Sequence, residues 1–118
     1  MNDKIKPRFK LRLLHDITDI YDDNIDAVVD LNDGKSFAIA FFTKKNIFSL
    51  CEKWKEVEKA YGCPGECLNG SYFWEIDSVI VEKLEYPLLE QVVADMLEQD
   101  EHVFEKHFTR MTDENEEI

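Results

Sequence analysis

Residues 25–43 read IDAVVDLNDGKSFAIAFFT, and this stretch has the pattern of a β-hairpin. Two runs rich in β-branched and aromatic residues, Ile25 to Leu31 and Ser36 to Thr43, flank the turn residues 32–35. Within that turn Asp33-Gly34 supplies the positive φ angles that a tight hairpin turn requires. The second run is apolar without a break from Phe37 to Phe42, as is typical of a strand covered on both faces. We therefore expect a hairpin whose second strand lies centrally in a sheet.

The residues on either side of the hairpin predict one more strand and a helix. Phe9, Leu11 and Leu13 alternate with Lys10 and Arg12, which predicts an edge strand with its cations in water. After the hairpin, apolar side chains recur at helical spacing from about 44 to 61. The glycine at position 62 then stands where a helix stop is expected. Residues 63–70 are predicted to form a loop because they contain Pro and Gly.

The second half of the chain completes an α+β order of elements. Residues 71–84 predict a strand with a bulge or short turn near 77–78, and we expect Trp74 to pack in the core. A helix is predicted from Pro87 to about Gln99, and helical spacing favours a further helix over 103–111. We expect a small single-domain sandwich over residues 1–111, with two to three helices on an antiparallel or mixed sheet of about four to five strands. Residues 112–118 are predicted to be an acidic disordered tail.

The chain is acidic, with a formal net charge of -12, although its first fourteen residues carry five Lys or Arg against one Asp. This surplus disfavours DNA, RNA and anionic membranes as partners, because phosphate contacts require clusters of cations. It favours basic proteins, which the electric field of the chain would attract. The sequence contains no signal-peptide pattern and no apolar run of membrane-spanning length, so a cytoplasmic location is expected.

The residue types that usually carry enzyme chemistry do not form a recognisable site. Cys51, Cys63 and Cys67 are an odd set without paired two-residue knuckles, which favours reduced thiols over a zinc site or a redox pair. The three histidines are isolated, and the chain has neither a nucleophile elbow nor a Gly-rich phosphate loop. We therefore expect a non-enzymatic protein without a cofactor or a metal.

Acidic and aromatic side chains form the best candidate surface. Residues 16–26 contain five aspartates and no Lys or Arg, and this stretch is expected to present a turn with clustered oxygens to solvent. Glu75 and Asp77 are expected to share one face of a strand near Tyr72, and exposed aromatics are good anchors in protein interfaces. A calcium loop is not indicated, because the spacing lacks the alternating oxygens and the mid-loop glycine.

Three stretches of the sequence, followed by a predicted helix that ends before Phe104 and Phe108, resemble in their arrangement small bacterial immunity proteins of contact-dependent inhibition systems. They are Phe41 to Ile47, Gly70 to Trp74 and Ser78 to Leu84. The resemblance implies a non-enzymatic protein that neutralises a cognate toxin, commonly a nuclease, by covering its active site or substrate groove. It fixes no binding residue, so charge and exposed aromatics provide the candidates. These candidate partner-binding residues are Asp19, Tyr21, Asp22, Asp23, Asp26, Asp30, Tyr72, Glu75 and Asp77.

Two other classes of protein also fit the sequence. One is a small domain that binds a ligand in a pocket whose residues are scattered along the chain. The other is a regulatory module that associates with itself through an exposed edge strand. The sequence leaves the oligomeric state open.

Overall fold

The hairpin lies at the centre of the fold and is confirmed. The computed structural model describes residues 8–111, and in it β2 (Asn24–Leu31) pairs antiparallel with β3 (Ser36–Thr43). The Asp33 carboxylate accepts a hydrogen bond from the Lys35 N–H at 3.0 Å, and Gly34 has a φ of 94°. The turn residues therefore close the hairpin as their types predict.

Three further strands extend the hairpin into a mixed sheet. β1 (Phe9–Leu13) pairs antiparallel with β2 at one edge, as expected. On the far side of β3, β4 (Ser78–Val81) runs parallel to its second half, and β5 (Arg110–Met111) pairs antiparallel with its first half. The sheet order is β1-β2-β3-β4, so β3 is central as predicted. Together with three helices this is an α+β domain, as the sequence predicts.

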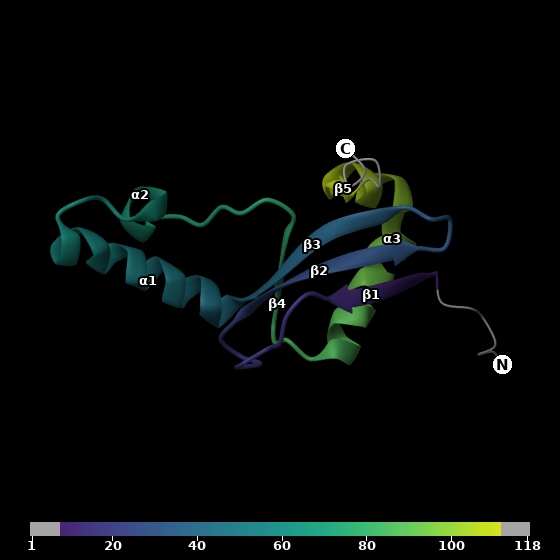
Figure 1. Cartoon of the computed structure of the whole chain (residues 1–118), viewed down its shortest axis with the longest axis horizontal. Helices are drawn as coiled ribbons and strands as arrows, with labels where there is room; N and C mark the ends of the chain where they lie inside the picture. Colours follow the sequence, from purple (N-terminus) through teal and green to yellow (C-terminus); the bar gives the residue numbers. More distant parts are fainter. Residues whose placement is uncertain (1–7, 112–118) are drawn as a thin grey trace.

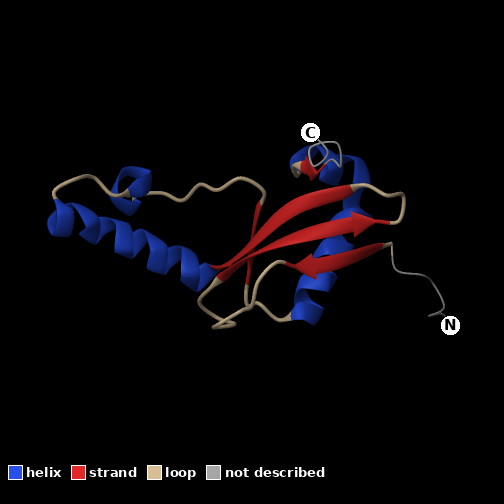
Figure 2. Cartoon of the chain, in the orientation of Figure 1, coloured by secondary structure: helices blue, strands red, loops and turns tan. Residues whose placement is uncertain are grey.

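One face of the sheet is covered by α3 (Tyr86–His107), which crosses it diagonally (Figures 1 and 2). Alternate residues of β2 and β3 point toward this helix, and the rings of Phe37 and Phe104 meet edge to face at 5.7 Å. The helix changes direction at Asp100, whose backbone is extended and whose carboxylate accepts from the N–H groups of His102 and Val103. The two helical segments that were expected here are thus one kinked helix, which ends at His107 and leaves room for β5.

Helix α1 (Lys44–Tyr61) projects away from the sheet as an arm (Figure 1). The Oγ1 atom of Thr43 caps its start by accepting from the Asn46 N–H at 3.0 Å, and Gly62 ends it with a φ of 78°. The predicted helix is confirmed, yet none of its residues is buried. Its apolar stripe instead packs against α2 (Glu66–Gly70) and against Phe73, whose ring stacks on Trp54.

The chain between α1 and β4 differs from the prediction. Residues 66–70, predicted to be a loop, form the single turn of α2, with left-handed backbone at Cys67, Leu68 and Asn69. Residues 71–77 are not a strand, because Phe73 turns inward and Asp77 has a φ of 60°, which interrupts strand pairing. The expectation that Glu75 and Asp77 share a strand face is therefore wrong.

Some predictions fall outside the described residues. The disordered tail over 112–118 and the first two lysines of the basic N-terminus belong to this group. Within residues 8–111 no helix combines the length and the apolar character that a membrane span requires.

Candidate partner-binding surface

The carboxylate of Asp23 is used within the chain. Its oxygens accept from the N–H and Oγ1 of Thr18 at 3.0 and 2.8 Å and from the N–H of Asn24 at 2.8 Å. Although partial burial opposes it, these hydrogen bonds lower the pKa of Asp23. The side chain is half-buried and closes the loop that leads into β2.

Asp22 and Asp19 are also engaged locally. The Asp22 carboxylate accepts from Asn46 Nδ2 at 3.2 Å and from Ser49 Oγ at 3.1 Å, which ties the loop to the first turns of α1. Asp19 accepts from the N–H of Tyr21 at 2.9 Å. The expected cluster of solvent-facing oxygens is therefore wrong for Asp22, which ties the loop to the arm, and for Asp23, which closes the loop itself.

Asp30 lies on the sheet beside two donors. Arg12 binds it through two nitrogen atoms, and Ser36 Oγ donates to it as well. The hydrogen bond from Arg12 lowers the pKa of Asp30 most strongly, against a smaller opposing effect of burial. Its negative charge is largely matched within the molecule.

The sheet face opposite α3 carries a shallow groove of about 250 Å³. Its floor is made of small or short side chains from the central strands, Val28, Ala38 and Ala40. Leu14 and Ile76 line its sides and are 55% and 63% exposed. We call this feature the open-face groove. No helix of the described residues covers it, but Val28 and Ala40 are buried, so its accessible apolar surface comes mainly from Leu14, Ile76 and Met111.

Three of the predicted acidic residues meet at the open-face groove. Asp26 comes from β2, and Glu75 and Asp77 come from the segment before β4. The Asp26 side chain is 68% exposed, and Glu75 is exposed as well. Asp77 is held by the N–H and Oγ1 of Thr109 at 2.9 and 3.1 Å. Within residues 8–111 the lining contains no Lys or Arg, so the groove combines an apolar floor with a negative rim.

A ridge of exposed side chains borders the groove. Phe73 anchors the segment, because its ring meets Phe42 at 5.0 Å and Trp54 at 6.3 Å. Its neighbours Tyr72 and Trp74 point outward, and Trp74 is 72% exposed. The expectation that Trp74 packs in the core is therefore wrong, and the neighbouring Phe73 is the half-buried ring of this segment. Tyr21 is exposed but lines neither the open-face groove nor the neighbouring hollow at Trp74.

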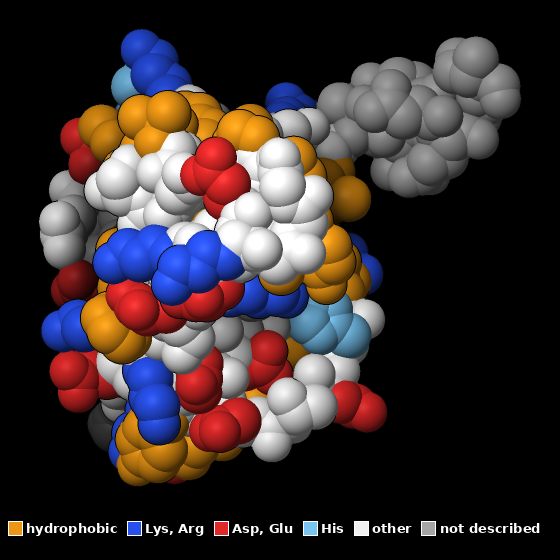
Figure 3. Space-filling model, turned by 90° about the vertical axis from the view of Figure 1, so that its left-hand side faces the viewer, with side chains coloured by type: hydrophobic (Ala, Val, Ile, Leu, Met, Phe, Trp, Pro, Cys, Tyr) orange, Lys and Arg blue, Asp and Glu red, His pale blue; other side chains and the backbone are white. Residues whose placement is uncertain are grey.

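Other polar clusters are balanced by their own counter-ions. Carboxylates of Asp33, Glu101 and Glu105 converge, but Lys35 binds the first and the last of these, and Arg8 binds Glu101. At the end of the molecule that carries α1, Lys and Arg side chains lie beside Asp and Glu (Figure 3). Ion pairs along α1, such as Lys55 with Glu52 at 2.9 Å, account for part of this mixture. These surfaces lack the single sign of charge that the open-face groove has.

The cysteines remain separate thiols, and none of them reaches the groove. Cys51 Sγ lies 3.7 Å from the carbonyl oxygen of Tyr72, where it helps to hold the ridge. His107 packs edge to face on Phe108.

Comparison with known proteins found no relative of this chain. No family model, no curated protein and no solved structure matches this chain. The fold and the groove therefore define the class: a small α+β domain with a kinked helix on one face of a mixed sheet and an acidic, apolar-floored groove on the other.

Some of the groove residues could be recognised from sequence patterns, and others could not. Leu14 continues the alternation of Lys10 and Arg12, which places it on the wet face of the first strand. Ala38 and Ala40 are small side chains in a strand of otherwise bulky residues, which signals a hollow on one face. Ile76 and Met111 could not be found in this way, because they reach the groove only through the irregular segment and through β5.

Proposed function

We propose that this protein is a non-enzymatic immunity protein that binds a basic toxin, with a nuclease as the best match, and neutralises it. The supporting observation is the open-face groove, where the exposed carboxylates of Asp26 and Glu75 flank an apolar floor without a lining Lys or Arg. His15 lies beside Asp26, with its Nε2 atom 3.9 Å from Oδ2. The partner chemistry that fits is a cationic surface with protruding apolar side chains.

Electrostatics favours such a partner over a small molecule. A nuclease carries a cationic substrate groove, and an acidic protein can occupy it in place of the nucleic acid phosphates. Attraction to a chain with a net charge of -12 would speed the encounter and would weaken as salt rises.

The apolar part of the surface supplies the contacts that hold a complex. Trp74, Ile76 and Leu14 are exposed around the groove. An exposed Trp is a usual anchor of protein interfaces, and the two aliphatic side chains add apolar surface beside it. Because Phe73 packs against Phe42 and Trp54, its segment, which includes Trp74 and Ile76, is held in place before binding.

Capture of the products of neighbouring genes tests the proposal. The tagged protein is used at low and high salt, beside the double variants Asp26→Lys with Glu75→Lys and Glu66→Lys with Glu98→Lys. Both pairs change the net charge equally, and Glu66 and Glu98 are exposed acids away from the groove. We expect capture of one basic protein that weakens at least tenfold in the groove variant and little in the control.

Equal weakening in both variants would show that only net charge matters and would contradict the groove as the site. Capture of no basic protein, together with a concentration-dependent dimer, would favour the self-associating class. A small metabolite that stays bound through purification would favour the ligand-binding class.

A further inference from the structure

We propose that the outer edge of β4 binds an extended basic segment of a partner protein, which adds a strand to the sheet. The segment belongs to the basic toxin of the proposed function, on which this inference rests.

The register of β4 leaves hydrogen-bonding groups on its outer side. Ala40 donates its N–H to the carbonyl oxygen of Asp77 at 2.9 Å, and Ala40 pairs with Ser78 in the parallel ladder. In a parallel pair only alternate residues bond to the neighbouring strand. The N–H and C=O groups of Ser78 and Ile80 therefore point away from β3. No other strand of residues 8–111 pairs with β4.

The two edges of the sheet differ in their protection. β1 carries Lys10 and Arg12, and charged side chains on an edge strand discourage further pairing. β4 reads Ser-Val-Ile-Val and has no charged residue, and Ile80 is 56% exposed. An uncharged, apolar edge of this kind is a template for an added strand.

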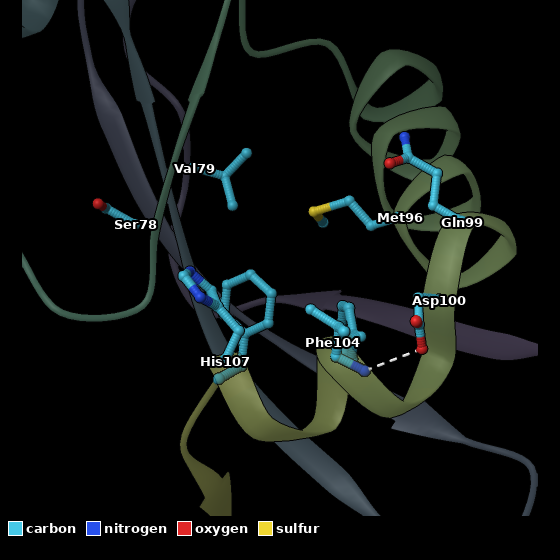
Figure 4. A pocket seen from close by; sticks show the side chains of 9 residues that line it. Ser78, Val79, Met96, Gln99, Asp100, Phe104 and His107 are labelled. Carbon is cyan, nitrogen blue, oxygen red and sulfur yellow. Dashed lines mark hydrogen bonds between the residues drawn. The ribbon is translucent and has the colours of Figure 1, made fainter.

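Hollows on both sides of β4 match the side chains of an added strand. One hollow of about 270 Å³ lies between β4 and the kinked part of α3, where Val79 faces Met96 across it (Figure 4). The other, of about 380 Å³, lies on the opposite face beside Trp74 and Ile80. Successive side chains of a strand point to opposite faces, so alternate residues of the segment would enter the two hollows.

Charge identifies the occupant as basic. Among the described residues that line the two hollows, Glu75, Asp77 and Asp100 are acidic and none is Lys or Arg. A second copy of this chain would bring together two molecules that each carry a net charge of -12. Repulsion between them disfavours a dimer across this edge, whereas a segment with lysine or arginine is attracted.

Amide exchange measured by NMR tests the proposal with a defined probe. The probe is a capped peptide of alternating lysine and valine, about seven residues long, which exceeds the four residues of β4. We expect the amides of Ser78 and Ile80 to exchange at least tenfold more slowly when the peptide is present at millimolar concentration. A peptide of alternating glutamate and valine should produce no such protection.

Variants of the protein distinguish peptide binding at the β4 edge from non-specific binding to exposed apolar residues. Ile80→Lys and Val103→Lys should each weaken peptide binding at least tenfold, because they place cations in the hollows. Phe48→Lys is the matched control, since Phe48 is an exposed apolar residue on α1 outside both hollows. A protein spectrum that keeps its dispersion shows that each variant is folded.

Unchanged exchange at Ser78 and Ile80 would overturn the proposal, and so would protection that rises with protein concentration without peptide, which indicates a second copy. If a basic toxin is captured while these amides stay unprotected in its complex, the proposed function stands and the edge site fails. If the peptide docks at the edge but no toxin is captured, the edge site stands without the proposed function.

Discussion

At the scale of single residues, carboxylates of the same type have different roles according to their neighbours. Asp23 is surrounded by donors from Thr18 and Asn24, whereas Asp26 is exposed on the open face. A hydrogen-bonded carboxylate contributes to folding, and an exposed one is available to a partner.

Asp23→Ala is predicted to destabilise the protein by about 1–3 kcal/mol at neutral pH, because it leaves the N–H of Thr18 and the part-buried N–H of Asn24 without their charged acceptor. Since the pKa of Asp23 is lowered in the folded state, its contribution to stability is present above the unfolded pKa of about 3.9 and is lost as pH falls through the folded pKa. Urea unfolding at several pH values measures the difference from wild type, which should shrink in acid. Asp16→Ala, at an exposed position, is the control. A stability difference between wild type and Asp23→Ala that grows in acid would contradict the stabilising role of the Asp23 carboxylate.

Residue types alone could not separate these roles. The partners of Asp22 lie 24 and 27 positions away in α1, and Thr109, the partner of Asp77, lies 32 positions away. Such pairings arise from tertiary structure, so the sequence could predict the acidic stretch but not which of its carboxylates remain free.

At the scale of elements, local patterns were sufficient wherever the chain follows a regular period. The hairpin over 25–43 and the helix that ends before Gly62 have local turn and cap signals, and both are confirmed. The segment 71–77 has an apolar content that fits a strand, but its conformation is decided by Phe73 against the arm and by the positive φ of Asp77. The hydrophobic periodicity of a sequence does not reveal such tertiary contacts.

Gly70→Ala is predicted to loosen the arm. Gly70 has a φ of 79°, and a Cβ atom there would lie 2.0 Å from the carbonyl oxygen of Cys51. Left-handed backbone alone costs about 1–2 kcal/mol for alanine, and the clash with α1 adds to that cost. We expect amides of α1 to exchange faster in this variant.

Gly34→Ala provides the comparison, because Gly34 has a φ of 94° but open space around it. It should show only the cost of the backbone conformation in urea unfolding. If urea unfolding showed the same loss of stability for Gly70→Ala and Gly34→Ala, the close approach of α2 to α1 would have no energetic importance.

At the scale of the whole molecule, the two faces of the sheet differ in whether a helix covers them. α3 buries one face in a core that includes Phe37, Leu89 and Phe104. The other face keeps the open-face groove, whose lining comes from β2, β3, β5, the segment before β4 and Leu14 directly after β1. The net charge could be read from the sequence, but the meeting of Asp26, Glu75 and Asp77 at one groove follows from the fold.

Protection of cells from a toxin tests the central claim most directly. The basic protein captured in the binding experiment is expressed in a sensitive host together with wild type, Asp26→Lys with Glu75→Lys, or Glu66→Lys with Glu98→Lys. We predict that wild type and the control variant restore growth, while the groove variant, at equal protein level, does not. Growth restored equally by all three, or by none of them, would contradict the account.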